Sequence, residues 1–368
     1  MNVVFRTDAS ITIGTGHVMR CLTLADAFRD CGLLCHFICG NHEGNLAGLI
    51  REKGYDCTLL PLPEGFSQPA NNLELAHAEW LGASQEDDAA VCKSIIRELK
   101  PSWVIVDHYG IDATWEGCVA GLGAKIFVID DLADRNHSCE ILLDQTFGRS
   151  KSDYELLVPP RAEILCGAEY SLLRPEFAAW RQASLGKRNR SELKCVLVNF
   201  GGVDKDNLTC SALQALEKSG LSNETEIIVV LGGGSPHITA VVAEAGNLRF
   251  SSEVIVSTKN MAELMAGADF AIGAAGATTW ERCCLGLPTL VLAIAENQQM
   301  AAQALADNNI AMLVSNSSNL VQAITSRIDV VNENRMSLLE LSDNCARVTD
   351  GCGVDRVLDS IARVYYYD

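Results

Sequence analysis

The sequence has no apolar run that approaches the roughly 18–20 residues of a membrane-spanning helix. It is also short of cations: 29 Lys and Arg face 47 Asp and Glu, and the formal net charge of −18 argues against nucleic acid or an anionic membrane as the main partner. The start of the chain lacks a basic segment followed by an apolar core, so we expect no signal peptide and a cytoplasmic protein. A small anionic ligand is compatible with this charge, because helix N-termini bind anions inside acidic proteins.

No CxxC pair occurs among the 15 cysteines, which weakens any prediction of a zinc site. The densest group is Cys31, Cys35 and Cys39, with His36 inside it. In the predicted strand Leu33–Cys39 only Cys35 and Cys39 share a face. We therefore favour reduced thiols that pack as small apolar residues.

Short apolar runs alternate with helical patterns along the chain, which predicts parallel sheets covered by helices on both faces. Asn2–Arg6 is a predicted strand that leads into a glycine loop and a helix from His17, and the same order starts again at Cys195–Phe200. A length of 368 residues fits two domains. We predict an α/β fold with two Rossmann-like domains facing a cleft. Its parts are an N-terminal domain (1–183), a linker (184–193), a C-terminal domain (194–345) and a terminal helix (346–368) whose placement the sequence leaves open.

The first candidate site is the glycine loop that ends at His17. Gly14 and Gly16 let the backbone approach a ligand closely. A histidine at a helix N-terminus has a lowered pKa and is neutral, so His17 is a candidate general base. The alternative is a solvent-exposed histidine near a helix cap, since a lone GxG motif is weak evidence.

Polar residues also follow the predicted strands Trp103–Asp107 and Lys125–Ile129. Asp107 is a candidate for orienting a histidine or a substrate hydroxyl, and Tyr109 for donating to a sugar, but we favour a turn with a capping Asp here. Asp130 and Asp131 are typical of a Mg²⁺ site or of a helix cap. We favour the cap, with Asp134 and Arg135 as charged partners, and no metal.

The most specific region runs from Asp269 to Gln298. After the predicted strand come Gly276, Ala277, Thr278 and Thr279, whose free N–H and hydroxyl groups suit a pyrophosphate. Glu281 lies one turn further and is in reach of two vicinal ribose hydroxyls. Another polar cluster, Glu296-Asn297-Gln298, follows the next predicted strand. The alternative is a plain αβ unit with a close-packed glycine.

These motifs resemble those of two known families. Two-domain glycosyltransferase-B enzymes, such as the N-acetylglucosaminyltransferase that makes lipid II, have a donor site similar to Gly276-Ala277-Thr278-Thr279-x-Glu281 followed by Gly286-Leu287-Pro288. The UDP-2,4-diacetamido-2,4,6-trideoxy-β-L-altropyranose hydrolases of pseudaminic acid biosynthesis have an N-terminal motif similar to Phe5-Arg6-x-Asp8-x-Ser10-x-x-Ile13-Gly14-x-Gly16-His17-x-x-Arg20. Further matches are Asp107-His108-Tyr109-Gly110, Asp130-Asp131, Asp153-Tyr154-x-x-Leu157-Val158-Pro159, Leu173-Arg174-x-Glu176-Phe177 and Gly201-Gly202-x-Asp204. The similarity covers about residues 1–315 in order; Trp280, bulky for such a loop, departs from it and is expected to face the core.

The resemblance implies a metal-independent hydrolase without a cofactor that cleaves the anomeric C–O bond of a UDP-sugar with inversion. Its product would feed a nonulosonic acid for flagellin or a surface polysaccharide. His17 would be the base, and Tyr109 and Asn297 would position the sugar or the diphosphate. The uracil would lie against backbone near Ser257–Thr258. The implied binding residues are Gly14, Gly16, Arg20, Arg174, Gly201, Gly202, Asp204, Thr258, Gly276, Ala277, Thr278, Thr279, Glu281 and Gln298.

Two other functions stay open. A glycosyltransferase of the same fold would pass the sugar to an acceptor other than water. It should carry an apolar acceptor-binding or membrane-docking patch on the N-terminal domain, and the sequence shows no basic amphipathic stretch of that kind. A nucleotide-sugar-binding protein without turnover is the third possibility, against which a histidine placed directly after two glycines is a weak argument.

Overall fold

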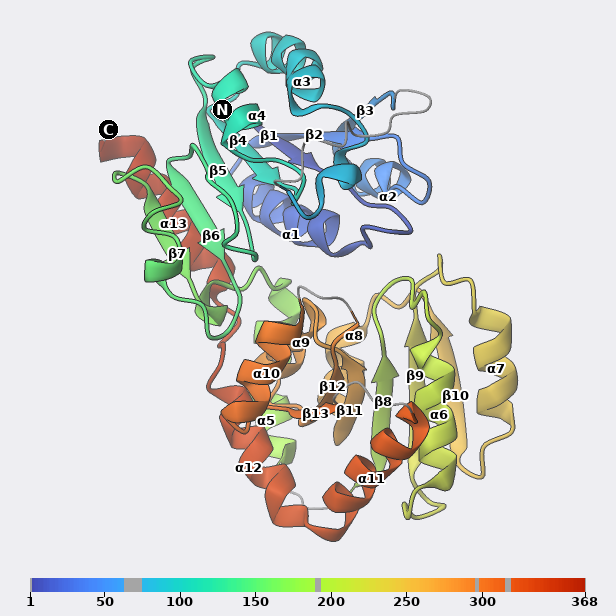
Figure 1. Ribbon diagram of the computed structural model, residues 1–368. Coiled ribbons are helices and arrows are strands. Elements are labelled where there is room, and N and C mark those ends of the chain that lie inside the picture. Colours follow the sequence, from blue (N-terminus) through green and yellow to red (C-terminus); the bar gives the residue numbers. More distant parts are fainter. Residues whose placement is uncertain (1, 63–74, 189–192, 295–297, 315–318, 368) are drawn as a thin grey trace. The chain divides into compact units, whose positions relative to one another are not determined.

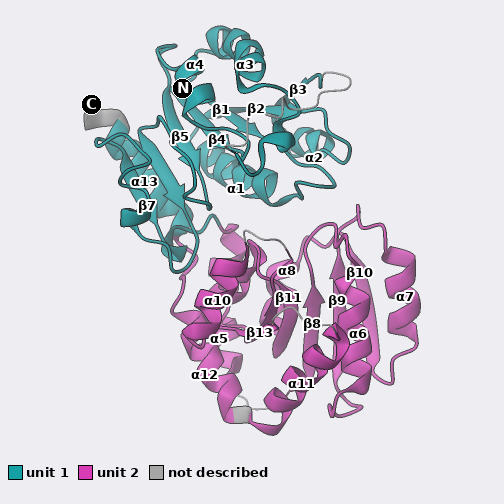
Figure 2. Cartoon of the chain, in the orientation of Figure 1, with its two compact units in different colours: residues 1–172, 353–368 teal, residues 173–352 magenta. Residues whose placement is uncertain are grey.

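The computed structural model describes residues 2–62, 75–188, 193–294, 298–314 and 319–367 (Figure 1). The chain forms two compact units (Figure 2). Unit 1 comprises residues 1–172 together with 353–368, and unit 2 comprises residues 173–352. No helix in the described part of the chain is both long and apolar enough to cross a bilayer.

Unit 1 is built on a seven-stranded parallel sheet of order β3-β2-β1-β4-β5-β6-β7. Its strands are β1 (Asn2–Thr7), β2 (Leu34–Gly40), β3 (Asp56–Leu60), β4 (Trp103–Asp107), β5 (Lys125–Ile129), β6 (Ile141–Asp144) and β7 (Glu163–Cys166). Its helices are α1 (Gly16–Asp30), α2 (Ala47–Glu52), α3 (Gln85–Leu99), α4 (Ala113–Val119) and α13 (Gly353–Tyr367), with short 3₁₀ turns η1 (Ala78–Leu81), η2 (Lys151–Asp153) and η3 (Ala168–Tyr170).

Successive residues of each central strand in unit 1 are buried on opposite faces of the sheet. Val3 and Phe5 pack with α1 and α13, whereas Val4 lies in a second core with α3 and α4. Both faces are therefore covered, which is why these strands are continuous apolar runs without a polar alternation. The predicted strands Trp103–Asp107 and Lys125–Ile129 are confirmed with those bounds.

Unit 2 repeats this architecture with a six-stranded parallel sheet of order β10-β9-β8-β11-β12-β13. Its strands are β8 (Cys195–Asn199), β9 (Glu226–Leu231), β10 (Ser251–Val256), β11 (Phe270–Ala274), β12 (Thr289–Leu292) and β13 (Met312–Val314). Its helices are α5 (Pro175–Arg188), α6 (Leu208–Lys218), α7 (Ile238–Gly246), α8 (Met261–Gly267), α9 (Thr278–Cys284), α10 (Gln299–Asp307), α11 (Leu320–Glu333) and α12 (Arg335–Ala346).

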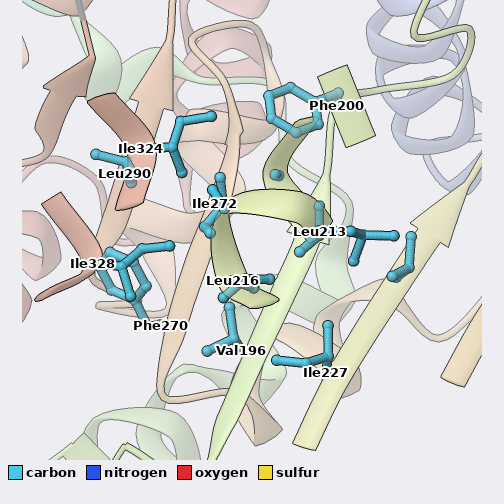
Figure 3. Close-up of a cluster of buried hydrophobic side chains, with 14 of the residues drawn as sticks. Val196, Phe200, Leu213, Leu216, Ile227, Phe270, Ile272, Leu290, Ile324 and Ile328 are labelled. Atoms are coloured by element: carbon cyan, nitrogen blue, oxygen red, sulfur yellow. The ribbon is translucent and has the colours of Figure 1, made fainter. Parts of the chain in front are cut away.

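A core of unit 2 lies between its sheet and the helices α6 and α11 (Figure 3). Val196 and Ile272 come from adjacent strands, Leu213 and Leu216 from α6, and Ile324 from α11, and each is at most 1% exposed. A Val, Leu or Ile side chain buried in this way contributes about 1.5–3 kcal/mol. This packing holds β8 and β11 side by side.

The unit boundary differs from the predicted one. Unit 2 begins at Leu173 and its first helix, α5, runs to Arg188, so the first part of the predicted linker 184–193 is helical. Residues 189–192 lie outside the described residues. The terminal helix, whose placement the sequence left open, is α13, and it returns to unit 1, where Val357 and Ile361 are buried with α1.

Each sheet has one point at which the strand order reverses direction, between β1 and β4 in unit 1 and between β8 and β11 in unit 2. The loops that follow two such strands diverge, and ligands of open α/β sheets bind there, outside the carboxyl ends. The loop before His17 and the residues after Asp107 lie at the first of these points. The glycine loops at 201–202 and 276–277 lie at the second.

Candidate active site

His17 lies in the first turn of α1, and its imidazole is fixed by Asp107 at the end of β4. The Nδ1 atom of His17 is 2.6 Å from Oδ1 of Asp107. A carboxylate only accepts, so Nδ1 carries the proton and Nε2 presents a lone pair. The favoured prediction of a capping turn at Asp107 is therefore wrong, because a short-range pattern could not show that the chain brings residue 17 to it.

Arg20, one turn further along α1, holds Asp107 from the other side. Its Nε and Nη2 donate to the two oxygens of Asp107 at 2.7 and 2.8 Å, and its Nη1 donates to Asp131 at 2.6 Å. Burial by itself raises the pKa of Asp107, but Arg20 and His17 outweigh it and hold that pKa well below its usual range. Asp107 is therefore a permanent anion that keeps His17 in one tautomer and one orientation.

Tyr109 completes this group. Its hydroxyl donates to Asp131 at 2.6 Å, and its ring meets the ring of His17 edge-on with centroids 4.5 Å apart. Burial and the neighbouring Asp131 raise the pKa of Tyr109. The prediction that Tyr109 donates to a sugar needs correction: its O–H donates to Asp131, so towards a ligand its oxygen is an acceptor.

The carboxylate pair after β5 has two separate roles. The carboxylate of Asp130 accepts from the amides of Leu132 and Ala133 at 3.2 and 2.9 Å and pairs with Arg135 at 2.8 Å, which confirms one predicted partner. The described residues between β5 and β6 form no helix, so Asp130 stabilises a turn and the predicted helix cap is wrong. Asp131 instead joins Arg20 and Tyr109, so the capping prediction is also wrong for it.

The residues that the sequence offers as possible metal ligands make other contacts in the structure. In the part of the chain that the structure describes, no group of three or more His, Cys, Asp or Glu is arranged to hold a metal ion. His36, from the cysteine-rich segment, forms a 2.8 Å hydrogen bond with the hydroxyl of Thr58.

The two glycines before His17 differ. Gly14 has φ of +82°, which explains a glycine there, and its amide donates to Ser10 at 2.8 Å. Gly16 has no positive φ, and a Cβ at this position would meet nothing within 4 Å. Nothing in the described chain therefore requires glycine at 16.

In unit 2 the loop before α9 leaves backbone donors unused. The amides of Gly276, Ala277 and Thr278 have no hydrogen-bond partner among the described residues. Thr279 differs, because its amide donates to Gly276 at 2.9 Å and its hydroxyl accepts from Arg282 at 3.0 Å. Its predicted contact with a phosphate is therefore not supported, and Thr279 closes the loop instead.

Glu281 and Arg174, both predicted nucleotide contacts, lie together: Nη2 of Arg174 is 3.6 Å from Oε1 of Glu281. Burial raises the pKa of Glu281, and the charge of Arg174 opposes that rise. The side chain of Gln298 lies against the same loop, because a Cβ at Gly276 would be 3.4 Å from its amide nitrogen. Asn297 lies outside the described residues.

Gly201 and Gly202 shape the loop after β8. Gly201 has φ of +90°, and Gly202 packs so closely that a Cβ on Gly232 would be 2.1 Å from its carbonyl oxygen. Two further predicted binding residues have structural roles. The carboxylate of Asp204 caps α6 by accepting from two of its amides at 2.9 and 3.0 Å, and the hydroxyl of Thr258 accepts from a backbone amide two residues on at 3.0 Å. Trp280 is buried, as expected.

Sequence reasoning missed two residues beside His17. The Trp80 ring is 6.2 Å from the His17 ring and stacks on Tyr109 at 5.7 Å, and His77 lies 4.4 Å from Trp80. Both come from the segment around η1, which follows no predicted strand. The pattern of apolar runs and strand ends therefore contained no signal for them.

It also missed the support behind the loop. Asp8 is fully buried, accepts from the amide of Gly40 and from Arg6 at 2.6 Å each, and lies 3.1 Å from Nε2 of His108. Since Nδ1 of His108 accepts from the amide of Gly110, its proton is on Nε2, facing Asp8. This network ties the ends of β1, β2 and β4 together beneath the site.

Comparison with known proteins is consistent with this geometry. Residues 196–352 match the glycosyltransferase family 28 C-terminal domain. The UDP-2,4-diacetamido-2,4,6-trideoxy-beta-L-altropyranose hydrolase of Campylobacter jejuni is 29% identical over 307 residues, which are 83% of this chain and 96% of that protein. The spore coat polysaccharide biosynthesis protein SpsG of Bacillus subtilis is 31% identical over 190 residues, 51% of this chain and 54% of SpsG.

Among solved structures, MurG of Acinetobacter baumannii superposes with a TM-score of 0.69 at 16% identity and covers 98% of this chain and 99% of its own. The prediction of two Rossmann-like domains of the glycosyltransferase-B type is confirmed. The resemblance to the altropyranose hydrolases is likewise confirmed.

Proposed function

We propose that this protein is an enzyme that acts on a UDP-sugar, and that it hydrolyses a UDP-linked 2,4-diacetamido-2,4,6-trideoxy sugar without a metal ion. The observation that carries the proposal is the His17–Asp107 pair, a base held by a permanent anion at the carboxyl ends of β1 and β4. The similarity to the Campylobacter jejuni hydrolase over most of both chains supports the choice of substrate.

In the proposed reaction, Nε2 of His17 takes a proton from water while the water oxygen bonds to the anomeric carbon. The bond between that carbon and the diphosphate oxygen breaks, and its electron pair leaves with UDP, so the sugar is released with inverted configuration. Asp107 stabilises the imidazolium that forms. General-base catalysis of this kind contributes about 10²–10⁴-fold.

Unit 2 would bind the UDP part. The unused amides of Gly276, Ala277 and Thr278 are donors for the diphosphate, where charge develops as UDP leaves. Glu281 would accept from the ribose hydroxyls, with Arg174 beside it. Gln298 and Asn297 would contact the diphosphate or the sugar. The uracil would lie against backbone at Ser257–Thr258. The released sugar would feed the synthesis of a nonulosonic acid for flagellin or a surface polysaccharide.

A glycosyltransferase is the second candidate, and the match of residues 196–352 to the glycosyltransferase family 28 C-terminal domain favours it. The same His17 would then take the proton of an acceptor hydroxyl instead of water. The two candidates share every residue described above and differ only in what attacks the anomeric carbon.

The deciding experiment incubates the purified protein with a panel of UDP-sugars in H₂¹⁸O, with and without candidate acceptors, and measures free UDP and the position of the label. The proposal expects UDP release without an acceptor, ¹⁸O in the sugar, the inverted anomer by early NMR spectra, and no loss of rate in EDTA. Label in UDP would show cleavage of a P–O bond, and release only with an acceptor would show transfer. A loss in EDTA that Mg²⁺ restores would overturn the metal-free reaction.

A further inference from the structure

Aromatic rings from separate segments of unit 1 meet beside the candidate base. Trp80 comes from η1, Tyr109 follows β4, and His17 begins α1. Tyr109 and Trp80 stack with centroids 5.7 Å apart and an interplanar angle of 25°, and both rings meet His17 edge-on. His77 lies 5.6 Å from Tyr109. We call His77, Trp80 and Tyr109 the ring cluster.

Hydrogen bonds to carboxylates hold the polar atoms of two of the four rings, Tyr109 and His17, in place. The Tyr109 hydroxyl is bound to Asp131 and Nδ1 of His17 to Asp107, both at 2.6 Å. Neither side chain can move out of this position without breaking a hydrogen bond to a carboxylate, a bond stronger than one between neutral groups. The Tyr109 ring, on which Trp80 stacks, is therefore held in place before any ligand arrives.

Trp80 has no evident part in the cores of unit 1. Its neighbour Leu81 is 1% exposed and packs into the core with α3 and α4, whereas Trp80 is half-buried and belongs to neither of the two buried apolar clusters found among the described residues of unit 1. Its indole nitrogen makes no hydrogen bond within the described part of the chain. A large aromatic side chain that serves neither core nor hydrogen bonding, placed beside a catalytic base, is typical of a ligand-binding surface.

The side chain of His17 keeps only 10% of its surface exposed. A molecule that reaches its Nε2 therefore also contacts the rings packed around it. An aromatic face attracts C–H groups but forms no strong hydrogen bond. A sugar hydroxyl buried against it would therefore lose its hydrogen bonds to water without replacement.

We propose that the ring cluster is a sugar subsite that selects substrates by their apolar groups, with Trp80 as its specificity-determining residue. Resting on the proposed function, it would favour a UDP-sugar whose ring carries methyl and acetamido groups over one that carries hydroxyl and hydroxymethyl groups. Tyr109, whose O–H donates to Asp131, offers an oxygen that accepts from an acetamido N–H. Apolar pockets distinguish substrates that differ by one small group about 10–200-fold.

The test compares kcat/KM for two UDP-sugars of the same gluco configuration that differ only at C4 and C6, 2,4-diacetamido-2,4,6-trideoxyglucose and N-acetylglucosamine. The variants are Trp80→Ala, Trp80→Phe and, as a matched control, Trp180→Ala, a tryptophan on α5 that is 38% exposed. We expect the wild type to prefer the deoxy sugar at least tenfold. Trp80→Ala should lower that preference about tenfold or more, while Trp80→Phe and Trp180→Ala keep it, and inhibition by UDP should stay unchanged in all three.

An equal loss for both sugars in Trp80→Ala would overturn the proposal, since it would show that Trp80 only packs. If Trp80→Ala does not fold, Trp80→Leu keeps apolar bulk without a ring face, and an unchanged preference in it would equally overturn the proposal. A wild type that releases UDP from no UDP-sugar would refute the proposed function instead. In that case, calorimetric binding of both intact UDP-sugars to the wild type and Trp80→Ala decides on the subsite alone, with loss of the deoxy-sugar preference supporting it and no change overturning it.

Discussion

The two units bury positive charge in opposite ways. In unit 1 each buried arginine of the site is paired with carboxylates: Arg6 with Asp8 and Asp88, Arg20 with Asp107 and Asp131, and Arg135 with Asp130. In unit 2 the buried Arg188 and Arg282 donate to carbonyl and hydroxyl oxygens. Burial lowers the pKa of each of these two to about 10.

The charged partners in unit 1 and the neutral partners in unit 2 correspond to two different structural roles. Pairs of full charges fix side-chain orientation, and in unit 1 they fix the side chains that surround His17. Arg282 instead donates to the carbonyl of Ala274 and the hydroxyl of Thr279, which holds the shape of the loop whose amides bind no other described residue. Unit 1 thus positions the candidate base, and unit 2 positions backbone. The predictions below break each arrangement in turn.

Replacing His17 by Ala should have the largest effect. With no base, turnover should fall about 10⁴-fold, the upper end for general-base catalysis, while UDP binding stays as in the wild type because the base belongs to unit 1. Steady-state kinetics and calorimetry with UDP measure both. His36→Ala is the matched control, since His36 bonds only to a threonine hydroxyl in the described structure. Turnover near the wild-type rate in His17→Ala would remove this histidine from the mechanism.

Asp107→Asn should lower kcat by about 10²–10³-fold. An amide presented to Nδ1 of His17 lets the imidazole proton move to Nε2, which is then no longer a base. A control is Asp112→Asn, which keeps the cap of α4. Thermal melting should accompany the kinetics, because Arg20 loses part of its charge partner. A full rate in Asp107→Asn would show that this anion does not set the tautomer.

Acid should act first on unit 1. Burial raises the pKa of Asp130, but Arg135 and further donors bring it down to about 2, below its ordinary value of 3.8. A carboxyl with a lowered pKa stabilises the fold above its ordinary pKa, and this stabilisation, about 2 kcal/mol, is lost as pH falls towards 2. In urea unfolding, the difference between wild type and Asp130→Asn should therefore shrink between pH 5 and pH 2.

Asp30→Asn, at an exposed position at the end of α1, is the control for that measurement and should show no pH-dependent difference. Pepsin, which is active in acid, should cut unit 1 before unit 2, because the buried arginines of unit 2 have neutral partners that acid does not protonate. Earlier cuts in unit 2 would contradict the comparison between the units.

The same contrast explains what could be predicted from the sequence. Strands buried on both faces are continuous apolar runs, so the sequence predicts Trp103–Asp107 and Lys125–Ile129 with the observed bounds. It does not predict the role of Asp107, because a carboxylate at a strand end has the same local pattern whether it caps a turn or binds a histidine 90 residues away. Trp80 was missed for a related reason: its partners are 29 and 63 residues distant in the chain. Likewise, the apolar stripe of α13 indicates that it packs, but not on which unit.

The smallest effect should come from unit 2, through Glu281→Gln. A hydrogen bond to a charged acceptor contributes about 1 kcal/mol more than one to a neutral acceptor, so UDP affinity should fall roughly fivefold and KM should rise with little change in kcat. Glu176→Gln is the matched control, since Glu176 pairs with the same Arg174. Unchanged affinity for UDP in Glu281→Gln would show that the ribose is bound elsewhere.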